Sequence, residues 1–171
     1  MELWGGFTLI EVMVALGVFS IAMLIVTGGF VRALKTERQA SSFTYVNDNL
    51  STIIEQITRE IRTAKDICTG NTSCSSQNTI SFVDAYGNDV TYCLQNAAIV
   101  RNSGLGCGSG QTITSSKVSI SYLSFIISGN RDNDHRPPRV TILISGGPKD
   151  QSASSYKVNL QTTVSSRIIG T

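Results

Sequence analysis

The chain has 171 residues, of which 41% are hydrophobic and 15% are charged, and its formal net charge is +2. This length suits one globular domain with an additional segment. The small net charge argues against a strongly basic nucleic-acid-binding protein. Hydrophobic residues are concentrated before residue 32. Ser, Thr, Asn and Gly are abundant after it, as expected of a β-domain with much exposed surface.

An almost unbroken apolar run begins in GGFTLIEVMVALGVFS (5–20), and no residue from Val12 to Val31 is charged. About twenty residues make roughly 30 Å of α-helix, which matches the hydrocarbon core of a bilayer. We therefore predict a membrane-spanning helix over residues 7–31. Glu11 lies about one turn inside it. A carboxylate buried near the bilayer centre costs about 2.5–3.5 kcal/mol, so Glu11 requires a compensating partner.

The apolar pattern changes after residue 31. Hydrophobic residues then recur at intervals of three and four, which predicts one apolar face of an amphipathic helix. No proline occurs before Pro137, so one continuous helix is expected over about residues 7 to 66, with residues 32–66 continuing into the globular domain. The residues of the apolar face are Phe43, Val46, Leu50, Ile53, Ile54, Ile57, Ile61 and Ala64.

Beyond residue 66 the hydrophobic period becomes two, which is typical of strands with one buried face. In KVSISYLSFIIS (117–128), Val118, Ile120 and Tyr122 are predicted to lie on one side of a strand. The other predicted strands are 79–84, 88–94, 97–101, 139–145 and 156–167.

Residues 67–171 are therefore expected to form an antiparallel sheet of about five or six strands. The apolar face of residues 43–64 is its natural cover, because both surfaces must be shielded from water. One helix face on one sheet face gives an α+β fold.

Four cysteines, Cys68, Cys74, Cys93 and Cys107, follow the apolar segment. An even number in a turn-rich region predicts two disulfides outside the cytosol. A zinc site is the competing interpretation, but spacings of 5, 18 and 13 intervening residues contain no CxxC pair, and His135 lies far off. Free buried thiols are a third. Of the three possible connectivities, sequential pairing needs the least chain reorganisation, and the sequence does not decide among them.

An enzymatic active site is not indicated. The chain has one histidine, no cluster of carboxylates in an apolar setting and no phosphate-binding glycine motif. The glycine-rich stretch SGLGCGSG (103–110) does not open a helix, as a nucleotide-binding loop does. No catalytic residue and no cofactor are predicted.

The stretch GGFTLIEVMVALGVFSIAML (5–24) resembles the amino-terminal segment of type IV prepilins and pseudopilins. The match covers Gly6, Phe7, Thr8, Leu9, Ile10 and Glu11, followed by an apolar helix. The segment LSTIIEQITREIRTAKDI (50–67) is similar to the helix end of J-type minor pseudopilins. The resemblance implies the pilin fold, in which a long amino-terminal helix packs by its second half on an antiparallel sheet.

The resemblance also implies a processing site. A prepilin peptidase would cut between Gly6 and Phe7, so that residues 1–6 are a leader and Phe7 becomes an N-methylated terminus. The carboxylate of Glu11 would then pair with the amine of Phe7 on a neighbouring subunit and set the register of a filament. Further implied partners are other pilin subunits and an inner-membrane assembly platform.

The implied location is the inner membrane, crossed once, with the carboxyl-terminal domain outside the cytosol before assembly into a filament. Two features depart from the family. MELWGG (1–6) carries Glu2 but no Lys or Arg, and Arg32, Lys35 and Arg38 follow the apolar helix, where the positive-inside rule predicts cytoplasm. The cysteines and the resemblance oppose that orientation. The competing hypotheses are an exported β-domain with an ordinary secretory signal and a membrane-anchored binding protein.

Calcium is the second metal, after zinc, that the sequence brings into question. RDNDH (131–135) offers the side chains of Asp132, Asn133 and Asp134, and some pseudopilins bind calcium. The ordinary interpretation is a solvated hairpin tip before Pro137, because few oxygen ligands are evident. The expectation is therefore no metal, with Asp132 and Asp134 as weak candidates.

Overall fold

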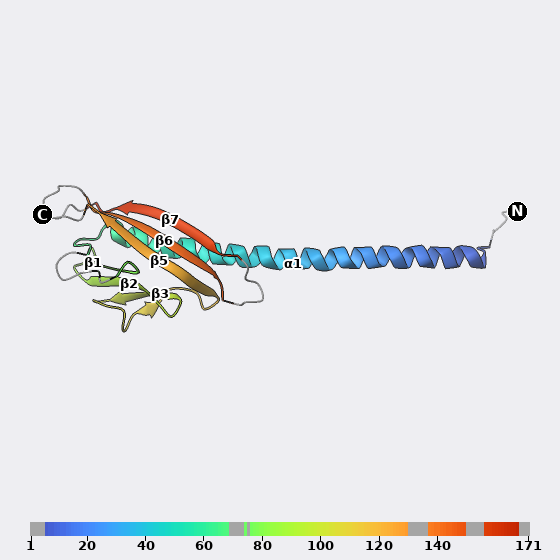
Figure 1. The fold of residues 1–171 in the computed structure, drawn as a ribbon, viewed down its shortest axis with the longest axis horizontal. Helices are drawn as coiled ribbons and strands as arrows, with labels where there is room; N and C mark the ends of the chain where they lie inside the picture. Colours follow the sequence, from blue (N-terminus) through green and yellow to red (C-terminus); the bar gives the residue numbers. More distant parts are fainter. Residues whose placement is uncertain (1–5, 69–73, 75, 130–136, 150–155, 168–171) are drawn as a thin grey trace. The chain divides into compact units, whose positions relative to one another are not determined.

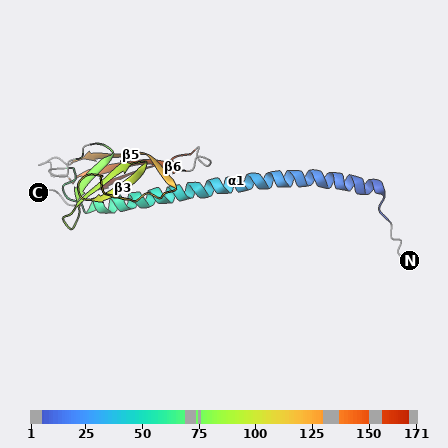
Figure 2. The ribbon, with the colours of Figure 1, turned by 90° about the horizontal axis from the view of Figure 1, so that it is seen from below.

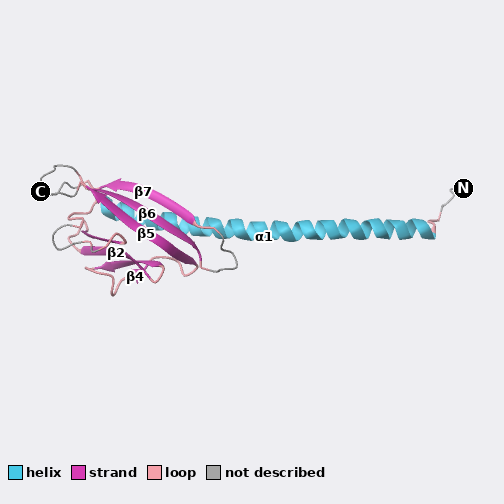
Figure 3. Cartoon of the chain, viewed as in Figure 1, coloured by secondary structure: helices cyan, strands magenta, loops and turns pink. Residues whose placement is uncertain are grey.

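The structure, a computed structural model, describes residues 6–68, 74, 76–129, 137–149 and 156–167. A single α-helix, α1 (Leu9–Arg62), precedes all the described strands, which confirms the α+β class (Figure 3). The chain divides into two compact units, Met1–Ser41 and Ser42–Thr171. The described strands are β1 (Thr79–Val83), β2 (Asp89–Gln95), β3 (Ala98–Ser103), β4 (Gln111–Thr112), β5 (Val118–Ser128), β6 (Arg139–Pro148) and β7 (Val158–Ser165).

The helix is slightly shorter than the predicted range of 7 to 66. At its end the amide of Thr63 donates to the Glu60 carbonyl and the amide of Ala64 donates to the Ile61 carbonyl. Bonds of this shorter spacing tighten the last turn of a helix. The chain has left the helical path by Lys65, which forms an isolated antiparallel bridge with Val83, and Asp66 after it has a positive φ of 49°.

The strands of the second unit form two antiparallel sheets, with the orders β1-β2-β3-β4 and β5-β6-β7 (Figure 1). The expected single sheet of five or six strands is therefore wrong. The first sheet lies next to β5 of the second. There the amide of Ile120 donates to the Ala97 carbonyl and the amide of Phe125 donates to the Gln77 carbonyl, each over 2.8 Å. Alternation identifies strands but not their partners, so a break between two sheets leaves no trace in the hydrophobic pattern.

The core of the second unit lies between the carboxyl-terminal part of α1 and the sheets (Figures 1 and 2). Ile54 is partly buried, whereas Phe43 is 46% exposed, so its predicted place in the buried face is wrong. Phe43 instead packs edge-to-face on Tyr156, with ring centroids 5.6 Å apart. The other predicted residues of the apolar face are buried, namely Val46, Leu50, Ile53, Ile57, Ile61 and Ala64.

A β-bulge in β5 changes which side chains face the core. The pairing of β5 with β6 shifts between Ile120 and Tyr122, so the extra residue Ser121 moves the alternation by one. Tyr122 is therefore 51% exposed, whereas Leu123 and Phe125 are buried. The prediction that Tyr122 shares a side with Val118 and Ile120 is wrong for this reason.

Candidate functional site

The residues around the predicted cleavage point precede the helix. Gly6, Phe7 and Thr8 are exposed and lie outside regular structure, and α1 begins at Leu9. A Cβ built on Gly6 has no heavy atom within 4 Å, and the side chain of Phe7 is 82% exposed. The peptide bond between Gly6 and Phe7 is therefore open to approach in the described part of the chain.

Thr8 is the N-cap of α1. Its Oγ1 accepts a hydrogen bond from the amide of Glu11 over 3.3 Å, and its carbonyl accepts one from the amide of Val12. Thr8 and Glu11 thus have the spacing of a capping box, in which a carboxylate in the first turn also complements the helix dipole. Sequence reasoning missed this local role of Glu11, although the pattern Thr-x-x-Glu is visible in FTLIEV (7–12).

The first part of α1 presents apolar side chains all around its circumference. By length and composition, α1 contains a stretch able to cross a membrane, and none of that stretch is buried within the chain. Its hydroxyl groups are satisfied inside the helix, because Ser20 Oγ donates to the Leu16 carbonyl and Thr27 Oγ1 to the Met23 carbonyl, each over 2.8 Å. Such internal bonds let a hydroxyl residue lie in lipid without a missing partner.

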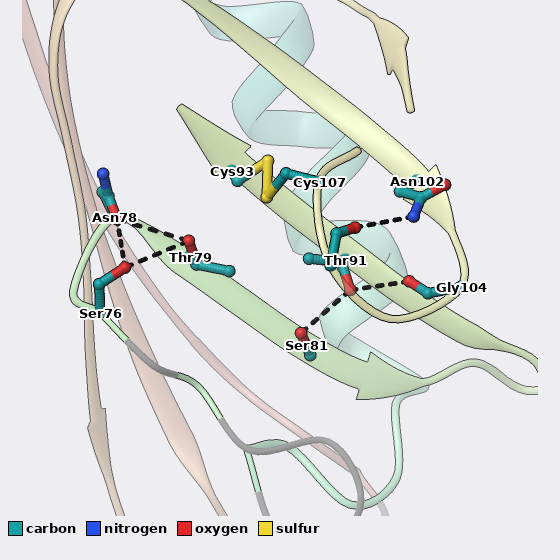
Figure 4. The surroundings of a disulfide bond; sticks show 10 residues. Ser76, Asn78, Thr79, Ser81, Thr91, Cys93, Asn102, Gly104 and Cys107 are labelled. Atoms are coloured by element: carbon teal, nitrogen blue, oxygen red, sulfur yellow. Dashed lines mark hydrogen bonds between the residues drawn. A yellow bond between two sulfur atoms is a disulfide. The ribbon is translucent and has the colours of Figure 1, made fainter. Parts of the chain in front are cut away.

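Both predicted disulfides are present, and the pairing is sequential. Cys68 joins Cys74, and Cys93 joins Cys107, with Cα atoms 5.0 Å and 6.3 Å apart. The second bond ties the glycine-rich loop to β2 (Figure 4). A disulfide framework suits an oxidising compartment outside the cytosol.

Side-chain hydrogen bonds hold the same glycine-rich loop. Thr91 Oγ1 donates to the Gly104 carbonyl over 2.8 Å, and Asn102 Nδ2 donates to the Gly106 carbonyl over 2.7 Å (Figure 4). Each bond gives a backbone carbonyl of the loop a hydrogen-bond donor. Together with the disulfide, they fix the loop to β2 and β3.

A polar network links α1 to β2 and β3 inside the second unit. Glu60 pairs with Arg101, and Gln56 Nε2 donates to the hydroxyl of Tyr92 over 3.4 Å. Burial raises the pKa of Tyr92 far above its ordinary value of 10.0, and the negative charge of Glu60 raises it further. Nothing in the sequence pairs the helix residues with the strand residues, because the two groups are at least 32 positions apart along the chain.

The calcium candidates belong to the stretch RDNDH (131–135). Asp132 and Asp134 lie outside the described residues. Within the ranges that the structure describes, no group of three or more His, Cys, Asp or Glu side chains is arranged to hold a metal ion.

The structure combines an exposed apolar helix, capped next to an accessible Gly-Phe bond, with a disulfide-bonded β-domain that follows it. These features define a class of α+β proteins with a membrane-type amino-terminal helix. The family described as the prokaryotic N-terminal methylation motif matches residues 5–27. The chain therefore carries the signature of the type IV pilins and pseudopilins. No curated protein and no solved structure matches the chain.

Proposed function

We propose that the chain is a minor pilin or pseudopilin, a structural subunit of a type IV pilus or of a type II secretion-like filament. The observation that carries the proposal is the methylation motif at residues 5–27, which lies at the start of an exposed apolar helix. The similarity of residues 50–67 to J-type minor pseudopilins supports the minor role. The subunit acts mechanically and has no enzymatic activity of its own.

The proposed life cycle begins in the cytoplasmic membrane. Residues 7–31 cross it once, and residues 67–171 lie outside the cytosol, where disulfides form. Prepilin peptidase removes residues 1–6, and the new amine of Phe7 is N-methylated. Glycine at position 6 leaves the backbone open to the peptidase, because no Cβ crowds the approach. The assembly platform then moves the subunit into a filament with other pilins.

Glu11 has two roles in this proposal. In the free subunit its carboxylate lies in the first turn of α1 and complements the helix dipole, next to the cap in which Thr8 accepts a hydrogen bond from the Glu11 amide. In the filament, the carboxylate of Glu11 pairs with the amine of Phe7 on a neighbouring subunit. An unpaired charge among packed apolar helices is strongly penalised, so only a neighbour docked at the correct rise is tolerated.

Three variants separate the two roles in a host with a working assembly system. Glu11→Gln keeps a side chain suited to a capping box but removes the charge, Glu11→Ala removes both, and Thr8→Val removes the cap alone. We expect all three chains in the membrane fraction, with incorporation into sheared filaments lost for both Glu11 variants and retained for Thr8→Val. Normal incorporation of Glu11→Gln contradicts the pairing role of Glu11.

The mature amino terminus tests the identity itself. Mass spectrometry of native material should find N-methylated Phe7 as the first residue. A terminus beyond about residue 27 would identify an exported β-domain with a secretory signal, and an intact Met1 would identify a plain membrane anchor. Gly6→Ala should block cleavage and so give a chain that stays in the membrane.

A further inference from the structure

The bond proposed for cleavage lies just before the residue that caps α1. Gly6 and Phe7 lie outside regular structure, Thr8 is the N-cap, and α1 begins at Leu9. Only Phe7 separates the Gly6–Phe7 bond from the cap. The conformation of this bond therefore depends on the residue at which the helix starts.

The hydroxyl of Thr8 takes an amide that a longer helix would use. The amide of Glu11 donates to Thr8 Oγ1 over 3.3 Å, whereas in a helix that began earlier it would donate to the carbonyl of Phe7. The first carbonyl to accept a helical amide is that of Thr8, from Val12 over 3.3 Å. Among the residues that the structure describes, none donates a backbone hydrogen bond to the carbonyl of Gly6 or of Phe7.

A helix that starts two residues earlier is the nearest competitor. Glycine is almost as good an N-cap as threonine, so Gly6 can take over that position when the cap at residue 8 is lost. The carbonyl of Gly6 would then accept the amide of Ile10, and Phe7 would be helical. At a membrane, unpaired backbone groups are costly, which favours this extension over fraying of the first turn.

Hydrolysis requires access to the same carbonyl. The oxygen of a water molecule adds to the carbonyl carbon of Gly6 and the C–N bond breaks. Gly6 keeps the new carboxyl group, and the nitrogen of Phe7 takes a proton and leaves as an amine. A carbonyl inside a helix lies against the following turn, which restricts the approach of water and peptidase, whereas a carbonyl outside the helix is open.

We infer that Thr8 is a positioning residue for the cleavage, because its cap keeps the Gly6–Phe7 bond outside α1. The inference rests on the proposed function, in which prepilin peptidase cuts this bond. Replacing an N-cap threonine by alanine typically shifts the equilibrium at the helix start by about fivefold. Cleavage should slow by the same factor when only the non-helical form is cut. Because cleavage is slowed and not blocked, such variants still mature and enter filaments with time.

Cleavage kinetics of the full chain in detergent test the inference. Purified prepilin peptidase is added with the chain well below KM, so that the rate reports kcat/KM, and mass spectrometry follows the loss of residues 1–6. Thr8→Ala should be cut about fivefold more slowly than the unmodified chain. Thr8→Ser and Thr8→Asn keep a capping oxygen and should be cut at the normal rate. Thr27→Ala removes a threonine hydroxyl from within the same helix and should leave the rate unchanged.

The start of the helix, read without peptidase, separates capping from recognition of the Thr8 side chain by the peptidase. The carbonyl and α-carbon NMR shifts of Gly6 and Phe7 should move toward helical values in Thr8→Ala and stay unchanged in Thr8→Asn. Slow cleavage of Thr8→Asn, or unchanged shifts in Thr8→Ala, overturns the inference. Equal cleavage rates for Thr8→Ala and the unmodified chain overturn it as well.

Failure of the proposed function is recognised separately. An unmodified chain that the peptidase does not cut between Gly6 and Phe7 counts against the pilin-type subunit itself, and the inference falls with it. An unmodified chain that is cut there, with Thr8→Ala cut equally fast, counts against the positioning role of Thr8 alone.

Discussion

Arg101 on β3 donates through Nε to both carboxylate oxygens of Glu60 on α1, over 3.0 Å and 3.2 Å. The two side chains are 27% and 23% exposed, so water screens the pair only in part. The guanidinium carbon of Arg101 also lies 6.0 Å from the ring centroid of Tyr92 on β2. This ion pair therefore fixes the helix against two neighbouring strands.

Removing the charge of Glu60 should destabilise the second unit. Glu60→Gln leaves the partly buried guanidinium of Arg101 without its counter-charge, and we expect the free energy of unfolding to fall by about 1–2 kcal/mol, between the values for exposed and buried pairs. Urea unfolding of the full chain in detergent, followed by circular dichroism, measures the change. Glu55→Gln on the exposed side of the same helix is the control, and an equal loss there contradicts a specific role for the pair.

The stability of the second unit should depend on the proton of Tyr92 at alkaline pH. Its pKa in the native state is raised above the ordinary value of 10.0, chiefly by burial, so the unfolded chain releases this proton first. The contribution is fully present below pH 10 and is lost as the pH rises toward the native pKa. Urea unfolding from pH 8 to 11 should show the free energy of unfolding falling above pH 10.

Two variants assign that pH dependence. Tyr92→Phe should flatten the fall above pH 10, because phenylalanine has no proton to release. Tyr86→Phe should leave it in place, because Tyr86 is 91% exposed. The same slope in Tyr92→Phe and in the unmodified chain excludes Tyr92 as its source.

Two glycines of the same loop should respond differently to alanine. A Cβ on Gly110 meets the side chain of Val100 and lies 2.8 Å from the carbonyl oxygen of Arg101, whereas a Cβ on Gly108 has no atom within 4 Å. Gly110→Ala should therefore lower the free energy of unfolding by about 1–3 kcal/mol through overpacking. Gly108→Ala should change it little. Urea midpoints of the two variants provide the comparison, and a tolerated Gly110→Ala shows that the loop moves away from β3.

The two disulfides should contribute unequally. Closing a loop removes more entropy from the unfolded chain when the loop is longer. Replacing Cys93 and Cys107 by serine should cost about 3 kcal/mol in the chain-entropy model. The same change at Cys68 and Cys74, which are only 6 positions apart, should cost less. The unfolding free energies of the two double variants decide this, and a larger loss at Cys68 and Cys74 contradicts the entropic argument.

Several features were predictable from sequence because each depends on residues near one another in the chain. The spacing of Val46, Leu50, Ile53, Ile57 and Ile61 is a property of one helix, and all five are buried. The β1–β2 hairpin was predictable for the same reason, since its strands and turn are contiguous. The pattern FTLIE (7–11) contains the whole cap of α1 as well as the start of the methylation motif.

Other features depend on which distant segments meet. The ion pair of Glu60 with Arg101 and the contact of Lys117 with the ring of Tyr45 each join residues that are dozens of positions apart. The division into two sheets likewise depends on which strands meet. Even the orientation of Tyr122 depends on a bulge whose register is set by β6.

For this protein, the sequence by itself determined the apolar helix, the amphipathic face that follows it, the strand-rich remainder and the family signature, because local periodicity and short motifs carry them. The tertiary structure decided the partners of the strands, the pairing of the cysteines and the residues that share a surface. The physical reason is that contact energies between segments depend on the folded path of the backbone, which brings together groups that no local pattern relates.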